Sequence, residues 1–256
     1  RSPSEKMVLV RMRALPSTNV LWNVASIDAN LALPLSRQKL TRQKMEDEIL
    51  GMDATQPGNR LIDYLGICYI ITDVVHPTTG IEPLIIDSIT FLENKYVLPR
   101  VQTFTRYEMA NSADDALNRL KQSKEPTLIL EPPFHKKESI KGLPASTAIN
   151  ISDALEISSS KITNVAYKFD VHARQPGWLF IADANYPGWQ AEIDGHSTPV
   201  YSAQVLGKAV FVPSGIHKIT VEFKPRSFMI GLFLMFLTLL ILLIFGIHHV
   251  YSKRFI

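Results

Sequence analysis

The feature that most constrains this chain is a long apolar run near the end of the sequence. Residues Phe228–Ile247 read FMIGLFLMFLTLLILLIFGI and carry no charge, and Thr238 is their single hydroxyl. An α-helix of 20 residues rises roughly 30 Å, which is the thickness of a bilayer's hydrocarbon core. A buried helix of a soluble protein normally keeps a polar stripe, and this run has none. The sequence therefore predicts a transmembrane helix at residues 227–249, followed by a short tail at residues 250–256.

The charges beside this helix are nearly balanced. Lys218, Lys224 and Arg226 precede the run, and Lys253 and Arg254 follow it. The positive-inside rule needs an excess on one side, and it weakens beside a long domain. Flanking charge alone therefore does not settle which side of the membrane the rest of the chain faces. The sequence starts at Arg1 with no charged-then-apolar leader, so we expect no signal peptide in it.

Residues 1–131 mix strand and helix patterns, which favours a mixed α/β domain. In Ser112–Ser123, Ser112 is a typical helix cap, and Asp114 and Asp115 suit the positive first turn. The acidic trio Glu46–Glu48 is expected to form a solvated helix face. The expected strands are Met7–Arg13, Ile67–Thr72, Arg100–Met109 and Thr127–Glu131, and the expected helices are Ser36–Leu50 and Ser112–Ser123.

Strand patterns dominate after a Pro-, Lys- and Ser-rich stretch at residues 132–147, which we interpret as a linker. Between residues 148 and 226, short apolar segments recur at 8–16-residue intervals, as in a β-sandwich. Trp189–Asp194 alternates apolar and polar residues, and Asp194–Gly195 is the pair typical of a type I′ hairpin turn. The predicted fold class is α+β: a mixed α/β layer, an antiparallel β-sandwich and one C-terminal transmembrane helix.

Several classes of function lack their signatures. A net charge of +3 with dispersed basic residues argues against nucleic acid as a partner. Cys68 is the single cysteine and lies in an apolar segment, so we interpret it as a core residue. The sequence holds no nucleophile elbow, P-loop, dinucleotide fingerprint or zinc-protease motif. We therefore assign no catalytic, cofactor-binding or metal-binding residue to this chain.

Aromatic residues around the YPGW segment are the remaining candidates for a ligand site. Aromatic rings can stack on the apolar face of a sugar while carboxylates bond its hydroxyls. The alternative is that the tryptophans are core residues of the sandwich, because Trp189 aligns with Ala191 and Ile193. Both interpretations stay open at this point. The candidate glycan contacts are Trp178, Asp183, Tyr186, Trp189, Asp194 and Tyr201.

The C-terminal part of the sequence resembles the YfhO-like family of polytopic bacterial membrane proteins. The shared pattern includes the YPGW turn with its Asp-Gly hairpin, the Val212–His217 turn VPSGIH, and Phe223, Pro225 and Ser227 before the last helix. Upstream, Leu61–Thr72 and Val97–Leu120 are similar to two further segments of the family. The resemblance spans roughly residues 8–247. Asn185 stands where a second Tyr is common, so one aromatic contact of the family pattern is absent.

The resemblance implies a parent protein that is a GT-C-like glycosyltransferase. Such proteins have many membrane helices, an early extracytoplasmic loop with acidic catalytic residues, and a polyprenyl-phosphate sugar donor. The matching segments imply that this chain is the extracytoplasmic C-terminal region and last helix, without the catalytic loop, and that the tail at residues 250–256 is cytoplasmic. Its implied partners are the lipid bilayer, the N-terminal transmembrane bundle of the same protein and a cell-envelope glycopolymer.

Three functional hypotheses follow. The first is a non-catalytic accessory region of a membrane glycosyltransferase that modifies cell-envelope polymers. The second is a structural or protein-interaction module of a membrane protein that binds no glycan. The third is a tail-anchored cytoplasmic protein inserted by its last helix.

Overall fold

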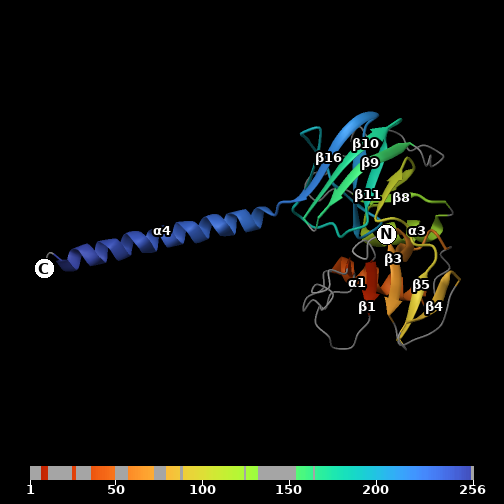
Figure 1. Cartoon of the computed structure of the whole chain (residues 1–256), viewed down its shortest axis with the longest axis horizontal. Coiled ribbons are helices and arrows are strands. Elements are labelled where there is room, and N and C mark those ends of the chain that lie inside the picture. The colour runs from red at the N-terminus through yellow and green to blue at the C-terminus, as the bar shows by residue number, and fades with distance from the viewer. Residues whose placement is uncertain are drawn as a thin grey trace.

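The computed structural model describes residues 7–10, 25–26, 36–49, 57–71, 79–86, 89–123, 125–131, 154–163 and 165–254 (Figure 1). Within these ranges the chain forms three β-sheets and four α-helices, the last of which projects away from the rest. The predicted α+β class with a sandwich and a C-terminal apolar helix is confirmed. The expected linker at residues 132–147 lies outside the described residues.

The N-terminal sheet has the strand order β2-β1-β3-β5-β4. Strand β1 pairs in parallel with β2 and β3, whereas β5 runs antiparallel to β3 and β4. Two helices accompany this sheet, α1 (Ser36–Ile49) and the short α2 (Leu61–Tyr64). The strands are β1 (Met7–Val10), β2 (Ala25–Ser26), β3 (Ile67–Ile71), β4 (Ile81–Ile86) and β5 (Ile89–Asn94).

The first sheet of the sandwich has five antiparallel strands in the order β13-β12-β16-β10-β9. The predicted turn is present, because Asp194 and Gly195 both have positive φ (51° and 80°) between the paired residues Ile193 and His196. Ala191 of β12 is buried between exposed neighbours, as its alternation predicts. The strands are β9 (Leu155–Ile162), β10 (Ala166–Ala173), β12 (Trp189–Ile193), β13 (His196–Thr198) and β16 (Gly215–Phe223).

The second sheet of the sandwich has six strands in the order β6-β11-β15-β14-β8-β7. It joins residues from both sides of segment 132–147, since β14 pairs with β8. The strands are β6 (Val101–Phe104), β7 (Tyr107–Met109), β8 (Leu128–Glu131), β11 (Gly177–Ile181), β14 (Tyr201–Ala203) and β15 (Gly207–Val212).

The prediction of one continuous strand at Arg100–Met109 is wrong. The chain breaks at Thr105–Arg106, and β6 and β7 lie at opposite edges of the six-stranded sheet. Both halves consist of residues that suit strands, and no Gly or Pro marks the break. The interruption comes from long-range pairing, β6 with β11 and β7 with β8, which a local pattern does not encode.

The six-stranded sheet is the middle layer of the molecule. Leu179 and Val210 face the five-stranded sheet in one apolar core. Trp178 and Phe180 point the other way, into a second core that includes α2 and α3 (Ala113–Gln122). Because both faces are covered, every residue of β11 is buried.

Helix α3 begins as predicted. The Ser112 side chain accepts a hydrogen bond of 3.1 Å from the backbone N–H of Asp115, and Ala116 and Leu120 are buried against the second core. The cap satisfies one of the amides that a helix start leaves without a partner.

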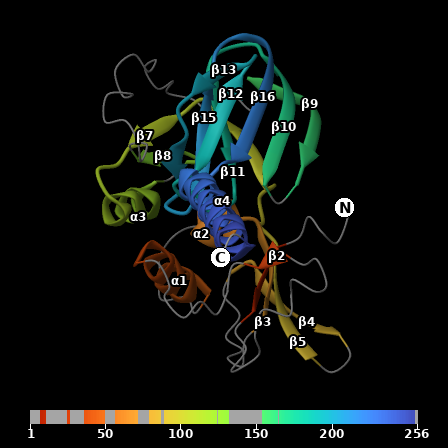
Figure 2. The same cartoon turned by 90° about the vertical axis from the view of Figure 1, so that its left-hand side faces the viewer.

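Helix α4 (Arg226–Arg254) follows β16 after two residues. Its stretch Ser227–Phe245 is long and apolar enough to cross a membrane, and none of it is buried against the rest of the chain. Figure 2 looks toward the side from which α4 projects. The end of β16 that leads into α4 pairs with the start of β10. We call this end of the sandwich, which carries Val165, Trp189 and Phe223, its base.

Candidate functional site

The structure divides the six predicted residues among different places. Trp178 and Tyr201 lie in the second core, with 1% and 2% of their surface exposed, so neither ring offers a face to a ligand. Trp178 packs edge-on against Tyr201 (centroids 5.1 Å apart) and against Phe211 (5.4 Å). Their burial matches the alternative interpretation of Trp178 as a core residue.

Asp194 lies in the β12–β13 turn, at the opposite end of β12 from Trp189. Its carboxylate accepts a hydrogen bond from the Lys218 backbone N–H (2.8 Å) and is hydrogen-bonded to His217 Nδ1 (2.7 Å). The His217 bond, with the backbone bond, lowers the pKa of Asp194. These bonds fix the turn against β16.

Asp183 and Trp189 lie together at a different place, with Lys208 between them. Lys208 Nζ is 3.2 Å from Asp183 Oδ2 and 3.8 Å from the centroid of the Trp189 ring. The Lys208 side chain has no exposed surface. A buried ammonium over an aromatic face, with a carboxylate partner, is held by both cation–π and ionic attraction.

Tyr167 and Arg100 complete this group, which we call the Lys208 cluster (Arg100, Tyr167, Asp183, Trp189 and Lys208). The Tyr167 hydroxyl donates to Asp183 Oδ2 and accepts from an Arg100 nitrogen at 3.2 Å. The Tyr167 ring lies 5.3 Å from Lys208 Nζ and 5.5 Å from the Trp189 ring. Asp183 and Arg100 are the rim of the cluster, with 29% and 26% of their side chains exposed.

Burial dominates the electrostatics of the cluster. It lowers the pKa of Lys208 from 10.5 to about 8, because loss of water outweighs the stabilising charge of Asp183. Burial alone would raise the pKa of Asp183, but Lys208, Tyr167 and Arg100 together bring it below its ordinary value. Burial and the Asp183 charge raise the pKa of Tyr167. At neutral pH the cluster is therefore an ion pair with a neutral phenol.

The cluster joins the two sheets of the sandwich. Arg100 precedes β6, Asp183 follows β11 and Lys208 is in β15, all in the six-stranded sheet. Tyr167 and Trp189 come from β10 and β12 in the five-stranded sheet. Because neighbouring strands run antiparallel, the starts of β6, β10, β12 and β15 lie at the same end of the sandwich as the end of β11. This end is the base.

Lys208 is the member that the sequence interpretation missed. The signal was present, since Lys208 shares its side of β15 with Val210 and Val212, both buried between the sheets. A lysine at an inward position of an alternating strand needs a buried partner, and Asp183 supplies it.

The YPGW segment connects the cluster to the start of α4. Trp189 is paired with Phe223, and the Lys224 N–H donates to the Gly188 carbonyl at 2.8 Å. Gly188 has a φ of +123°, and a Cβ there would come within 2.9 Å of the Phe223 ring and 3.1 Å of Pro225. Glycine is thus required by both backbone conformation and close packing. Tyr186 is half-buried, and its carbonyl accepts from the Trp189 N–H at 3.3 Å.

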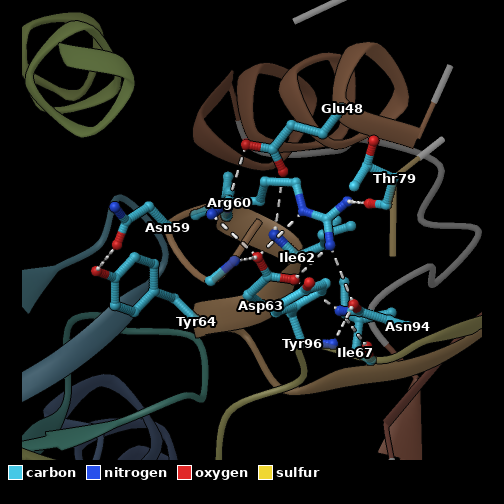
Figure 3. A network of polar contacts seen from close by, with 12 residues as sticks. Glu48, Asn59, Arg60, Ile62, Asp63, Tyr64, Ile67, Thr79, Asn94 and Tyr96 are labelled. Atoms are coloured by element: carbon cyan, nitrogen blue, oxygen red, sulfur yellow. Dashed lines mark hydrogen bonds and ion pairs between the residues drawn. The ribbon is translucent and has the colours of Figure 1, made fainter. Parts of the chain in front are cut away.

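A second buried polar group connects the start of α2 to the end of β5 (Figure 3). We call Arg60, Asp63 and Asn94 the Arg60 network. The Asp63 carboxylate accepts hydrogen bonds from Arg60 Nε (3.1 Å), from a second Arg60 nitrogen (3.2 Å) and from the Asn94 side-chain amide (2.8 Å). It also accepts from the backbone N–H groups of Gly58 and Arg60.

The expectation that Glu46–Glu48 form a solvated face is wrong for Glu48. Its side chain is fully buried and accepts from the N–H groups of Leu61 (2.9 Å) and Ile62 (3.1 Å), while Lys44 Nζ lies 3.4 Å away (Figure 3). Glu48 therefore caps the start of α2 from a neighbouring helix. Burial raises its pKa from 4.5 to about 7 despite the Lys44 charge.

Among the residues that the structure describes, no group of three or more His, Cys, Asp or Glu side chains could hold a metal ion. The oxygens of Asp183 already accept protein hydrogen bonds, and Lys208 is out of reach of solvent. The Lys208 cluster is therefore suited to holding the two sheets of the sandwich together.

Comparison with known proteins gives one match. Residues 136–235 match the family model of the bacterial membrane protein YfhO. This match covers 100 of the 256 residues, so this part of the chain is similar to the YfhO family. The matched span contains the whole five-stranded sheet, the YPGW turn and the first part of α4. No curated protein and no solved structure matches the chain.

Proposed function

We propose that this YfhO-like chain is the non-catalytic, extracytoplasmic C-terminal region of a GT-C-like membrane glycosyltransferase. In this proposal the parent protein transfers sugar from a polyprenyl-phosphate donor to a cell-envelope polymer. The acidic catalytic residues belong to another part of the parent. The sandwich orients the acceptor polymer beside the membrane, next to the parent's other helices.

The observation that carries this proposal is the direct connection between sandwich and membrane helix. Only Lys224 and Pro225 separate β16 from α4, and the Lys224 N–H is bonded to Gly188. The Phe223 N–H donates to the Val165 carbonyl at 2.9 Å, so a second hairpin holds the same junction. A sandwich attached in this way keeps a fixed distance from the bilayer, as an element that positions a substrate requires.

Loosening this junction in the complete protein tests the proposal. Six Gly and Ser residues inserted after Pro225 let the sandwich move while leaving its core intact. We expect glycosylation of the envelope polymer to fall strongly, although the protein still accumulates in the membrane. The matched control inserts the same six residues between Pro213 and Ser214, both exposed in the β15–β16 connection. Equal glycosylation in the two variants would sink the proposal.

A second candidate is a structural or protein-interaction module that binds no glycan. It is favoured by the burial of Trp178 and Tyr201 and by the use of Trp189 and Asp183 to hold Lys208. Titration calorimetry of the whole chain in nanodiscs with purified envelope glycopolymer separates the two. Binding heat that Trp189→Ala abolishes supports glycan contact, whereas no heat, together with a lower melting temperature for Trp189→Ala, supports the module.

The orientation needs its own test, because a tail-anchored cytoplasmic protein is the third hypothesis. A cysteine at the exposed Ser159, in a Cys68→Ser background, is labelled in intact cells with a membrane-impermeant maleimide. Labelling without permeabilisation is expected for an extracytoplasmic sandwich. Labelling only after the inner membrane is opened would assign the sandwich to the cytoplasm.

A further inference from the structure

The base of the sandwich exposes apolar side chains next to the membrane helix. Ile162, at the end of β9, is 39% exposed and Val165, just before β10, is 58% exposed. Thr163 and Ala166 close this hairpin through a backbone hydrogen bond of 2.8 Å. The tip of the β9–β10 hairpin therefore holds two apolar side chains that the rest of the described structure does not cover.

This tip is tied to the residues that lead into α4. Phe223, which donates to the Val165 carbonyl, stands four positions before Ser227, where the apolar span begins. In the sheet, β10 lies next to β16 and β9 next to β10 (Figure 2). The tip thus lies at the level where the chain enters the apolar span, and Phe228 and Met229 of α4 are themselves exposed.

The charges near the tip also suit a lipid surface. Lys161 and Lys168 are both exposed and stand directly opposite each other on β9 and β10. Like charges in such a pair repel each other in water, and lipid phosphates would relieve the repulsion. Glu222 is nearby, but Lys224 pairs with it at 2.6 Å. The Tyr186 and Trp189 rings, half-buried at the same end, are of the kind enriched at membrane interfaces.

From these observations we propose that the β9–β10 tip inserts into the headgroup region of the bilayer that α4 crosses. Ile162 and Val165 enter the interface, while Lys161 and Lys168 contact lipid phosphates. The sandwich then has two attachments to the membrane, one covalent through α4 and one through the hairpin. Two attachments prevent rotation about the helix axis, which a single helix would permit.

The chain supplies a matched control for this proposal in Ile216. It is 80% exposed, and its pairing with His172 places it at the opposite end of the same sheet. Phe223 is seven positions farther along the strand, which is roughly 23 Å at 3.3 Å per residue. A probe at position 216 therefore measures quenching at an exposed apolar position of the sandwich that is far from the base.

The experiment uses the whole chain in vesicles of phosphatidylethanolamine and phosphatidylglycerol. In a Cys68→Ser background, a single cysteine replaces Val165 or Ile216 and carries an environment-sensitive fluorophore. A fraction of the lipid bears a spin label at the headgroup or high on the acyl chain. We expect quenching at position 165 to exceed quenching at position 216 by about two-fold or more, since interfacial burial reaches only the first 5–10 Å.

Equal quenching at the two positions would overturn the proposal. If Val165→Cys does not fold, judged by circular dichroism and melting temperature, Ile162→Cys takes its place with the same expectation. The inference does not depend on glycosyltransfer, so a failure here leaves the proposed function to its own test, and the reverse also holds.

Discussion

Two of the buried ion pairs in the described part of the chain, Arg60–Asp63 and Asp183–Lys208, are built in opposite ways. In the Arg60 network, Asp63 has no exposed surface and gathers partners from Gly58, Arg60 and Asn94. In the Lys208 cluster, Asp183 stays 29% exposed and the buried partner is the cation, enclosed by aromatic rings. One encloses a carboxylate in donors, whereas the other encloses an ammonium in π faces.

The difference follows from what each pair connects. Arg60 and Asp63 are three residues apart, and their bonds fix the turn that starts α2 and attach it to β5 through Asn94. Asp183 and Lys208 are 25 residues apart in the six-stranded sheet, and their contacts with Tyr167 and Trp189 attach it to the other sheet at the base of the sandwich. We therefore expect the first pair to govern stability of the N-terminal part, and the second to govern the attachment between the sheets.

Removing Asp63 is expected to have the largest effect. Asp63→Ala leaves the buried Arg60 guanidinium without its carboxylate, and loss of one partner from a buried pair costs about 3–5 kcal/mol of the free energy of unfolding. Arg60→Lys should also destabilise strongly, because an ammonium cannot reproduce the two-pronged contact. Thermal unfolding of the chain in nanodiscs measures both. Asp115→Ala, at a partly exposed ion pair on α3, is the control and should change stability far less.

An Asp63→Ala chain that unfolds at the same temperature as the Asp115→Ala control would contradict this prediction. It would mean that water reaches Arg60 and replaces the carboxylate.

Lys208→Met is expected to have a smaller effect. Met fills most of the same volume against Trp189, and Asp183 is partly exposed and keeps Tyr167 and Arg100 as partners. We expect a loss of about 1–3 kcal/mol, the usual consequence of leaving one polar partner unsatisfied. Adding Asp183→Asn should recover part of that loss, because the remaining charge is then removed. A double variant that is less stable than the sum of the two single changes would contradict the proposed coupling.

The pH dependence of stability should also differ between the N-terminal part, which contains Glu48, and the Lys208 cluster. Burial raises the pKa of Glu48 from 4.5 to about 7, so over that window the folded state holds a proton that the unfolded state has released. Stability from Glu48 should therefore fall as pH rises from 4.5 to 7, by at most about 1.4 kcal/mol per pH unit. Glu48→Gln should flatten this part of a plot of melting temperature against pH.

Lys208 should produce the opposite slope. Its pKa in the folded state is about 8 instead of 10.5, so between these values the unfolded state holds the extra proton. Stability should therefore rise with pH above 8, again by at most about 1.4 kcal/mol per pH unit. Measurement between pH 8 and 9.5 avoids the tyrosines. A rise that persists unchanged in Lys208→Met would show that another group causes it.

The features predicted correctly from the sequence are those that neighbouring residues determine. The apolar span, the Asp194–Gly195 turn and the Ser112 cap each depend on a few consecutive residues, and each is present. The alternation in Trp189–Ile193 also gave the right inward face, since Ala191 is buried between the sheets and Trp189 and Ile193 pack partly buried beside it.

The features that were missed depend on long-range pairing. The strand break at Thr105 separates β6 from β7 because each pairs with a distant strand. Glu48 is buried because α2 starts against it, 13 residues farther along the chain. The six candidate glycan contacts shared a segment but not a location, since Trp178 and Asp183 end on different faces of the middle sheet. Glycan contact by Asp183 or Trp189 stays a prediction.

The smallest effect on stability is expected for Arg100→Lys. The equivalent change in the other pair, Arg60→Lys, should by contrast destabilise the Arg60 network. Arg100 Nε is buried and has no hydrogen-bond partner among the described residues. A terminal nitrogen of the guanidinium lies 3.8 Å from Asp183 Oδ2 and donates one hydrogen bond to the Tyr167 hydroxyl. A lysine keeps the charge near Asp183 and removes the unsatisfied nitrogen, so we expect a change below about 1 kcal/mol in either direction. Thermal unfolding of Arg60→Lys and Arg100→Lys under one condition compares the two pairs directly. Similar losses in both would mean that the Lys208 cluster depends on guanidinium geometry as the Arg60 network does, and the contrast between a donor-enclosed carboxylate and an aromatic-enclosed ammonium would fail.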